Sequence, residues 1–363
     1  MASGADGVSR SDAGAAIVSH LVLENTACPL CGEPQSHTVL VASDLLYGCP
    51  GEFKLARCAA CYHVFLNPRP TRECIGQFYP ADYGPFRGAL SVPRPLGSGQ
   101  CGPLPNGRGT VTRSWKCLRR LVLWWIDSRA APIPHSPLPA PYSPLALELG
   151  CSHGAFLHQL RERGWKCVGI EPAAEVARRA VETGLDVRVG SLESVVASDP
   201  QTFAPSSFDA IFAWMVIEHL HDPVATLRLA RELLKPGGTL SISVPNFGCW
   251  EQRTFGRVWY ALQLPTHLQH FTSASIRRML AASGLELVEV IHQRNVNNLV
   301  GSLGLWLRTK FPRWSLGERL IHWTDNPSAI GLCLLTPLAR ILAIVRQSGR
   351  LTVVARRSNP PMR

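Results

Sequence analysis

The chain has 363 residues, of which 46% are hydrophobic and 17% charged, and its formal net charge is +11. This length and composition exclude a fibrous or wholly disordered chain and allow a globular protein with a sizeable core. The positive charge is local, because residues 301–363 hold 10 Lys/Arg against 2 Asp/Glu. An anionic surface such as lipid headgroups fits this pattern at least as well as nucleic acid, and we expect no nucleic-acid partner.

Residues 1–24 lack a basic start followed by a sustained apolar run, so we predict a disordered leader rather than a secretory signal. The longest apolar stretch, residues 329–345, is interrupted by Pro337 and Arg340 and is short for a membrane span. The 12 cysteines are therefore expected to be reduced, in a cytoplasmic protein. Under those conditions clustered cysteines more often bind metal than form disulfides.

Two C-x-x-C pairs lie in residues 25–84, a segment that ends in a Pro-rich, aromatic extension. They are Cys28 with Cys31 and Cys58 with Cys61, and 26 residues separate the pairs. Two such knuckles complete a closed tetrahedral S₄ site with no open position for chemistry. The spacing predicts a zinc ribbon with a structural Zn²⁺; the alternative is four buried or redox-active cysteines.

Residues 85–144 are expected to form a linker, because they are rich in Gly and Pro. Within this linker, Trp115, Leu118, Val122, Trp125 and Ile126 share one helical face, which predicts an amphipathic helix over 114–127.

From Leu145 onwards, short apolar strands alternate with helical segments, and this pattern predicts an α/β core over residues 145–296. We expect a doubly wound, mostly parallel seven-stranded sheet. An apolar, basic and helical insertion over 297–350 should precede the last strand, which lies in 351–363 with the tail. The predicted strands are residues 145–149, 166–171, 186–190, 208–215, 239–245, 285–293 and 351–357, and the predicted helices between them are residues 155–163, 172–182, 223–234 and 273–283.

The segment GCSHG after the first strand matches both a serine-hydrolase elbow at Ser152 and a glycine turn that holds a nucleotide. No sheet is predicted upstream of Leu145, so this is the first βα turn, where nucleotide cofactors bind in doubly wound sheets. Glu171 ends the second strand, 21 residues after Gly150, where an acid can accept hydrogen bonds from ribose hydroxyls. Glu148 precedes the turn, where a carboxylate suits a cationic amino-acid group better than a pyrophosphate.

These motifs resemble class I S-adenosylmethionine-dependent methyltransferases of the bacterial methyltransferase-domain family that carry an N-terminal zinc ribbon. The resemblance rests on ELGCSHGAFL, GIEP, FDAIFAWMVIEHLHDP and LKPGGTLSISVPN, and it extends through residue 290 and into CPLCG and RCAACYHVFLNPRPT. It implies a Rossmann-like methyltransferase fold and S-adenosylmethionine as cofactor. The expected cofactor contacts are Glu148, Gly150, Ser152, Gly154, Glu171, Ser191 and Leu192.

Ser152 stands where the family usually has a glycine. If the acceptor is a hydroxyl or an acidic carbon, methyl transfer also needs a general base. The candidates are Glu218 and His219 after the fourth strand, with His219 preferred, and then His267 and His270. Each histidine has a structural alternative, as a loop anchor or a hydrogen-bonding partner.

Some zinc-ribbon sugar C-methyltransferases carry a similar Glu-His pair together with a tyrosine near it. Val216 lies two residues before Glu218, which argues against sugar C-methylation. Four aromatic residues follow the fifth strand: Trp250, Phe255, Trp259 and Tyr260. They could form a wall or lid for an acceptor, or they could belong to the core beneath a helix.

The insertion over 297–350 has three interpretations: an extra helical layer or homodimer contact, a lid over an apolar acceptor, or a basic amphipathic surface that contacts a membrane. The sequence predicts an enzyme that transfers a methyl group to oxygen or carbon of a small molecule, such as a sugar, lipid-linked or natural-product intermediate. The alternative is a non-catalytic zinc-ribbon binding protein on a methyltransferase scaffold.

Overall fold

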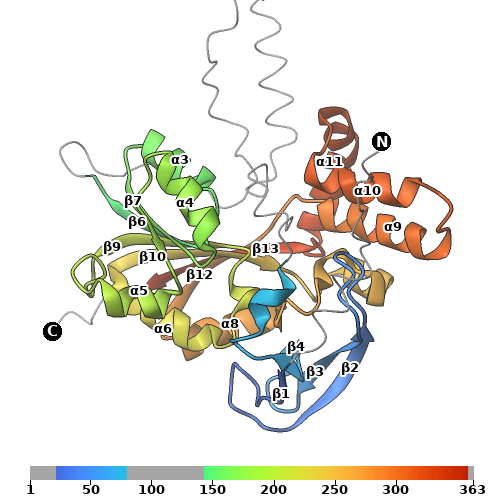
Figure 1. Cartoon of the computed structure of the whole chain (residues 1–363), viewed down its shortest axis with the longest axis horizontal. Coiled ribbons are helices and arrows are strands. Elements are labelled where there is room, and N and C mark those ends of the chain that lie inside the picture. Colours follow the sequence, from blue (N-terminus) through green and yellow to red (C-terminus); the bar gives the residue numbers. More distant parts are fainter. Residues whose placement is uncertain (1–21, 80–142, 359–363) are drawn as a thin grey trace, which may run out of the picture.

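The computed structural model describes residues 22–79 and 143–358, and a seven-stranded sheet forms its centre (Figure 1). The strand order is β12-β13-β10-β9-β6-β7-β8, in which β13 runs antiparallel between β10 and β12 and the remaining pairs are parallel. The strands are β6 (Leu145–Leu149), β7 (Lys166–Glu171), β8 (Val187–Val189), β9 (Phe208–Trp214), β10 (Leu234–Pro245), β12 (Leu285–His292) and β13 (Arg350–Arg357). The predicted mostly parallel, Rossmann-like sheet is confirmed.

Helices cover both faces of this sheet, as parallel strands with buried residues on both sides require. On β6, Leu147 belongs to the core under α5, α6 and α8, whereas Ala146 belongs to the core under α3 and α4. The bounds are α3 (Ala155–Glu162), α4 (Ala174–Glu182), α5 (Leu192–Ser198), α6 (Pro223–Leu233) and α8 (Ser273–Ala282). The carboxyl ends of β6, β7 and β9 consequently meet at one edge, between the two helical layers.

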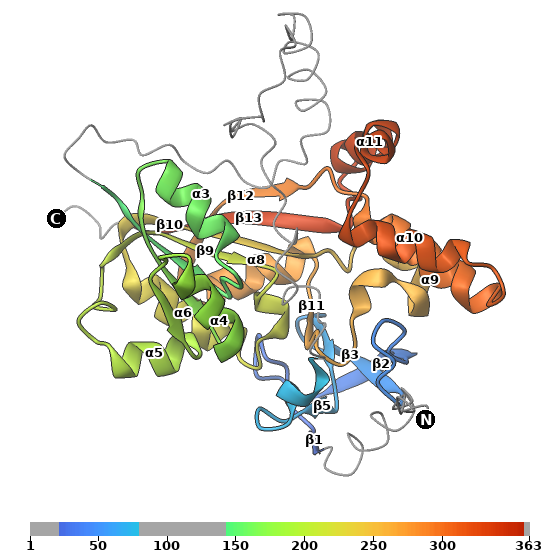
Figure 2. The same ribbon diagram turned by 45° about the horizontal axis from the view of Figure 1, so that its top comes forward.

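The cysteine-bearing segment forms a small module whose sheet is completed by the α/β domain. The four-stranded sheet has the order β11-β4-β3-β2, and β11 (Gln269–His270) comes from the α/β domain (Figure 2). The module's elements are β1 (Leu23–Glu24), β2 (Ser36–Ala42), β3 (Phe53–Cys58), β4 (Val64–Leu66), β5 (Arg69–Pro70) and the 3₁₀ turn η2 (Ile75–Phe78). One apolar core joins Phe53 and Leu66 of the module to Trp259 and Leu268 of the domain, so the two parts pack as one body.

The segment between β12 and β13 is helical, which confirms the predicted insertion before the last strand. It contains α9 (Asn297–Lys310), α10 (Leu316–Asp325) and α11 (Ala329–Ile344). No single helix among the described residues has the length and hydropathy to span a bilayer. Helix α10 and residues 330–344 together have the required length and hydropathy, but the two helices meet at a bend of 84°.

Three local features differ from the sequence expectation. Helix α4 begins at Ala174, so Pro172 lies outside it rather than in its first turn. Strand β10 begins at Leu234, five residues earlier than expected, with a register irregularity between Leu234 and Thr239. Helix α5 was not expected from the sequence; its N-terminus is closed by a capping box from Ser191 to Ser194. The amphipathic helix predicted over 114–127 lies outside the described residues.

The segment after β10 forms α7 (Trp250–Phe255) and two 3₁₀ turns, η5 (Gly256–Val258) and η6 (Tyr260–Leu262). Trp259 is 1% exposed and belongs to the core shared with the N-terminal module, whereas Trp250 is 43% exposed. The four aromatic residues therefore form no single wall. For Trp259 the structure supports the core interpretation.

Candidate functional site

The glycine turn after β6 has the backbone of a ligand-binding loop. Gly150, Ser152 and Gly154 have φ values of +63°, +48° and +76°, which explains why two of the three positions are glycine. A Cβ atom at Gly150 would lie 2.6 Å from Cγ2 of Val216. Gly150 thus lets the turn pack directly against the segment that leads from β9 to Glu218.

Two buried acids flank this turn, as predicted from the sequence. Glu171 accepts hydrogen bonds from the backbone N–H groups of Ser152 and Ala173, both at 2.9 Å, which ties the ends of β6 and β7 together. Glu148 is 2% exposed, and its Oε2 has no hydrogen-bond partner within residues 22–79 and 143–358. Burial raises the pKa of both carboxyl groups, and the negative charge of Glu171 adds to the effect on Glu148. A buried carboxyl with an unused acceptor fits a cationic ligand group, such as the ammonium of S-adenosylmethionine.

Ser191 and Leu192 have structural roles that need no cofactor. The Ser191 hydroxyl caps α5 by accepting from the Ser194 N–H, and Leu192 is 4% exposed within the core. Any contact of these two residues with a cofactor is therefore expected through their backbone rather than through these side chains.

Glu218 and His219 lie in the 3₁₀ turn η4 (Ile217–His219), which follows β9 at the same edge of the sheet. Nδ1 of His219 lies 2.9 Å from the carbonyl oxygen of Thr266 and 2.9 Å from the hydroxyl of Tyr79. Because a carbonyl only accepts, Nδ1 carries the proton and Nε2 holds the lone pair. Burial lowers the pKa of His219 to about 4, so the imidazole is neutral at physiological pH and Nε2 can accept a proton.

His267 lies beside His219, with 4.7 Å between the ring centroids. Its Nδ1 donates to the carbonyl oxygen of Ala261 at 3.0 Å, and burial lowers its pKa well below the usual value. His270 instead lies in β11, paired with Val64, and its ring is 5.4 Å from that of Phe247. The structure brings His267 to the Glu218–His219 turn and places His270 in the contact with the N-terminal module.

Glu218 is fully buried, and neither of its carboxylate oxygens has a hydrogen-bond partner among the described residues. Burial raises its pKa to about 8, against the opposing charge of Arg350. One ligand atom from each of Glu218, His219 and His267 falls within 4.8 Å of the others, a set that could hold a divalent cation. The positive charge of Arg350 beside Glu218 works against a bound cation.

Sequence reasoning missed three residues at this edge. The hydroxyl of Tyr79 is hydrogen-bonded to His219. Burial raises the pKa of Tyr79, and the negative charges of Glu218 and Glu171 raise it further, so the phenol lies near the predicted base and the predicted ribose acid. Arg350 begins β13, and Glu251 in α7 is buried near it, with a pKa raised by burial to about 7. Tyr79 stood in an aromatic run that was noticed only as an extension of the module. Nothing local marked Arg350 or Glu251.

The four cysteines of the two knuckles come together at the end of β3. Sγ of Cys28 lies 3.5 Å from Sγ of Cys61, and Sγ of Cys31 lies 3.5 Å from Sγ of Cys58. All four Sγ atoms lie within 4.8 Å of one another. Zn–S bonds of ~2.3 Å in a tetrahedron separate the sulfurs by roughly 3.8 Å, so this set fits a zinc ion.

The two knuckles have the same backbone geometry. Gly32 and Tyr62, each directly after the second cysteine, have φ values of +76° and +61°. Their N–H groups donate to the carbonyl oxygens of Cys28 and Cys58. Burial raises the pKa of Cys28 and Cys61, which disfavours thiolates unless a cation neutralises them.

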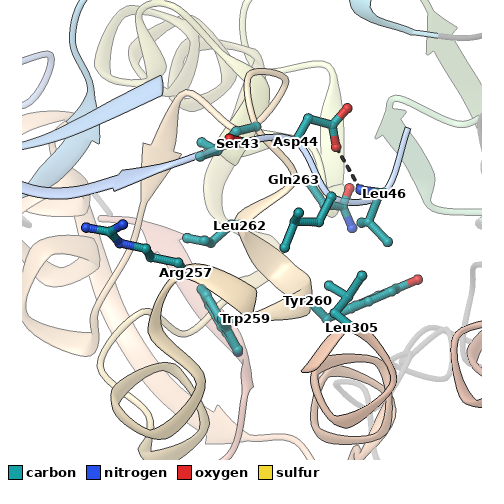
Figure 3. A pocket seen from close by; sticks show the side chains of 11 residues that line it. Ser43, Asp44, Leu46, Arg257, Trp259, Tyr260, Leu262, Gln263 and Leu305 are labelled. Carbon is teal, nitrogen blue, oxygen red and sulfur yellow. Dashed lines mark hydrogen bonds between the residues drawn. The ribbon is translucent and has the colours of Figure 1, made fainter. Parts of the chain in front are cut away.

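A pocket lies where the N-terminal module meets the helical insertion (Figure 3). The β2–β3 loop, held by the bond from Leu46 N–H to Asp44, forms one wall, and Trp259, Tyr260 and Leu305 line the others. Trp259 and Tyr260, two of the four aromatic residues considered for an acceptor wall, line it, but none of the predicted catalytic, cofactor or metal residues does. Tyr260 and Leu262 of η6 flank Ala261, the acceptor for His267, so this pocket borders the histidine pair from outside.

Over part of its length the chain is similar to known methyltransferases. Residues 129–290 match a family model described as a methyltransferase domain. The ubiquinone biosynthesis O-methyltransferase of Xanthomonas euvesicatoria pv. vesicatoria is 30% identical over 156 residues, which cover 40% of this chain and 63% of that protein. The protein of the same name from Xanthomonas campestris pv. campestris (strain B100) is 32% identical over 133 residues, covering 34% and 54% respectively. The chain thus spans less than two thirds of the length of these curated relatives.

One solved structure with a limited likeness to this chain is described as a complex between the Haloferax volcanii Trm112 methyltransferase activator and the putative methyltransferase. Its TM-score is 0.41 at 19% identity, covering 62% of this chain and 87% of that one. A putative sarcosine dimethylglycine methyltransferase from Galdieria sulphuraria has a TM-score of 0.41 at 15% identity, covering 60% and 79%.

The sheet order and the glycine turn with its two acids define an α/β domain of the nucleotide-binding type. Over residues 129–290 the chain matches the methyltransferase-domain family model, and it is similar to proteins named as O-methyltransferases over part of their length. Its N-terminal four-cysteine cluster is compatible with a zinc ribbon.

Proposed function

We propose that this protein transfers a methyl group from S-adenosylmethionine to an oxygen or acidic carbon of a small polar molecule, with His219 as general base. The observation that carries the proposal is Tyr79, which bonds to His219 and lies close enough to Glu171 and Glu218 for their charges to raise its pKa. The base and the cofactor acids therefore share one edge of the sheet.

The cofactor-binding part of the proposal assigns a role to each flanking residue of the glycine turn. Glu148 would accept from the ammonium group of S-adenosylmethionine, and Glu171 from the ribose hydroxyls, while the left-handed turn at Gly150 to Gly154 lets the backbone approach the ligand. S-adenosylmethionine supplies a methyl group on a positively charged sulfur, which is already a good leaving group. Positioning of the acceptor then makes the largest contribution to lowering the activation barrier, and this contribution can reach ~7–11 kcal/mol.

His219 would take the acceptor's proton on Nε2 as the new bond to the methyl carbon forms and the carbon–sulfur bond breaks. Its Nδ1–H stays on the Thr266 carbonyl, which supports the imidazolium that results. Glu218 is the neighbour of this base in the chain, and the charge of Arg350 acts on Glu218 and on His267. These two residues would offer a carboxyl and a guanidinium to a polar acceptor. The relatives named as O-methyltransferases support transfer to a hydroxyl over transfer to carbon.

We also propose that Cys28, Cys31, Cys58 and Cys61 hold a structural zinc ion. The module is small, and a zinc ion can contribute ~10–16 kcal/mol of apparent binding free energy to such a fold. The module in turn provides β4 as the partner of β11, whose Gln269 follows the His267 segment. The zinc would therefore act on catalysis through the position of this segment and through the position of Tyr79 at the end of the module.

The test has two parts. Calorimetry should show S-adenosylmethionine binding to the purified chain, and a screen with labelled methyl donor against small-molecule extracts should yield a labelled product. Absence of S-adenosylmethionine binding would contradict the proposal. Binding without transfer to any acceptor would support the non-catalytic alternative.

A further inference from the structure

Helix α11 is apolar on two opposite sides, although only one side packs against the part of the chain that the structure describes. Its inward side includes Ala339 and Leu342, which are 3% and 8% exposed. Its outward side carries six exposed apolar residues: Ile330, Leu334, Leu338, Ile341, Ile344 and Val345. At 100° per residue these six fall within an arc of about 120°, which makes one continuous stripe.

The stripe is strongly exposed, and helix α11, which carries it, lies at the periphery of the molecule in Figures 1 and 2. Ile330, Leu334 and Ile344 are 76%, 75% and 79% exposed. Isolated apolar side chains on a surface are ordinary, but a helix that is apolar all round is normally buried. A contiguous exposed stripe of this kind indicates a contact surface.

The tip of the α9–α10 hairpin presents a second apolar group. The rings of Phe311 and Trp314 stack at 4.8 Å, Trp306 lies beside Phe311 at 6.1 Å, and all three side chains are exposed. Exposed tryptophan next to basic residues is the composition typical of segments that lie in the interfacial region of a bilayer.

The charge of this helical layer indicates which kind of partner could cover the apolar surface: an anionic surface, a second copy of the chain or another segment of the same chain. Residues 297–350 hold 7 Lys/Arg against 2 Asp/Glu. Lys310, Arg313, Arg319 and Arg346 are exposed. In a twofold dimer through this surface the basic groups of both copies would face each other, which is unfavourable. The basic segment 114–127 of this chain would meet the same repulsion.

We propose that the outward face of α11, together with the α9–α10 tip, docks on an anionic lipid surface. The stripe would enter the boundary between headgroups and acyl chains, while the basic residues contact the headgroups. At 16 residues α11 is about 24 Å long, short of the ~30 Å hydrocarbon core, so the helix lies along the surface. This proposal does not depend on methyl transfer, because lipid binding is measured without donor or acceptor.

The experiment is co-sedimentation of the full chain with vesicles of phosphatidylcholine alone and of phosphatidylcholine with phosphatidylglycerol. The test variant is the double substitution Leu334→Ser with Ile341→Ser. The matched control is Val181→Ser with Val288→Ser, two apolar side chains on α4 and β12 that are 48% and 54% exposed.

The wild type and the control should bind the anionic vesicles, and salt should weaken this binding several-fold. The Leu334→Ser, Ile341→Ser variant should bind at least tenfold more weakly. Equal binding by that variant, equal binding to both vesicle types or no binding by the wild type would overturn the proposal. Light scattering that finds a dimer for the wild type and a monomer for the Leu334→Ser, Ile341→Ser variant would also overturn it. So would a melting temperature of this variant well below that of the wild type, if the control variant melts normally. That result would mean that another part of the chain covers the stripe.

Discussion

The hydroxyl of Tyr79 lies 2.9 Å from Nδ1 of His219, and this contact joins the end of the N-terminal module to the predicted base of the methyltransferase domain. The two residues are 140 positions apart in the chain. Since Nδ1 also donates to Thr266, two groups orient one imidazole. The module thus has a direct structural connection to the proposed catalytic site.

Replacing Tyr79 with Phe should lower kcat about fivefold, the effect expected from the loss of one hydrogen bond of about 1 kcal/mol. The Thr266 carbonyl would still hold the tautomer. Steady-state kinetics with labelled donor checks this, and the dissociation constant of S-adenosylmethionine serves as control and should stay within twofold. A loss above about 10³-fold would show that the phenol itself reacts with the acceptor.

Substitution of His219 by Ala should reduce kcat by ~10²–10⁴, the range typical of a general base. The same substitution at His267 should have a smaller effect, because Nδ1 of His267 is bound to Ala261 and the residue supports the loop around His219. S-adenosylmethionine affinity, measured by calorimetry, should be unchanged in both variants. If His267→Ala is the more damaging substitution, the roles of the two histidines are reversed.

Glu218 should make stability depend on pH. Its pKa of about 8 in the folded protein lies above the unfolded value of about 4.5. Its contribution is therefore fully present below pH 4.5 and is lost as pH rises through 8, with a total of at most about 5 kcal/mol. Glu218→Gln cannot ionise, so the variant should match the wild type near pH 5 and exceed its melting temperature at pH 8.5. Parallel melting curves across this range would show that Glu218 does not titrate as described.

Mutation of Cys58 to Ser should remove the zinc ion and lower the melting temperature. The four sulfurs form a closed set, so a single serine leaves three ligands and an incomplete tetrahedron. Metal analysis of the wild type should find about one zinc per chain, with less than a tenth of that in the variant. Cys49→Ser is the matched control, because Cys49 lies outside the cluster. A folded wild type without metal would end the zinc-ribbon assignment.

Glu171→Ala should weaken S-adenosylmethionine binding by at least tenfold, because it removes the ribose acceptor and leaves two backbone N–H groups without their partner. Ser152→Ala should keep most of the activity, and Ser152→Gly should be tolerated at least as well, since φ at this position is +48°. Calorimetry and methyl-transfer assays distinguish these outcomes. Complete loss of activity in Ser152→Ala alone would revive the hydrolase interpretation of GCSHG.

Local patterns in the sequence were enough to predict most of the methyltransferase domain. Apolar runs of strand length marked β6, β7 and β9 to within a residue, and the glycine turn with Glu148 and Glu171 predicted where a nucleotide would bind. These signals are short-range, because strand burial, turn conformation and acid placement depend on neighbouring residues. Helix α5 is not predicted, because seven residues are too few to show a clear helical periodicity of apolar residues.

The sequence by itself determined the fold class, the glycine turn after the first strand of the α/β domain and the grouping of the four cysteines into two knuckles, since each depends on spacing along the chain. Only the tertiary structure decided that Tyr79 and Arg350 lie beside Glu218, that His270 belongs to a sheet shared with the N-terminal module, and that α11 keeps an apolar face outside. The first two of these relationships join residues 132 to 206 positions apart in the chain. Such contacts arise from the packing of distant segments, and local patterns in the sequence do not predict them.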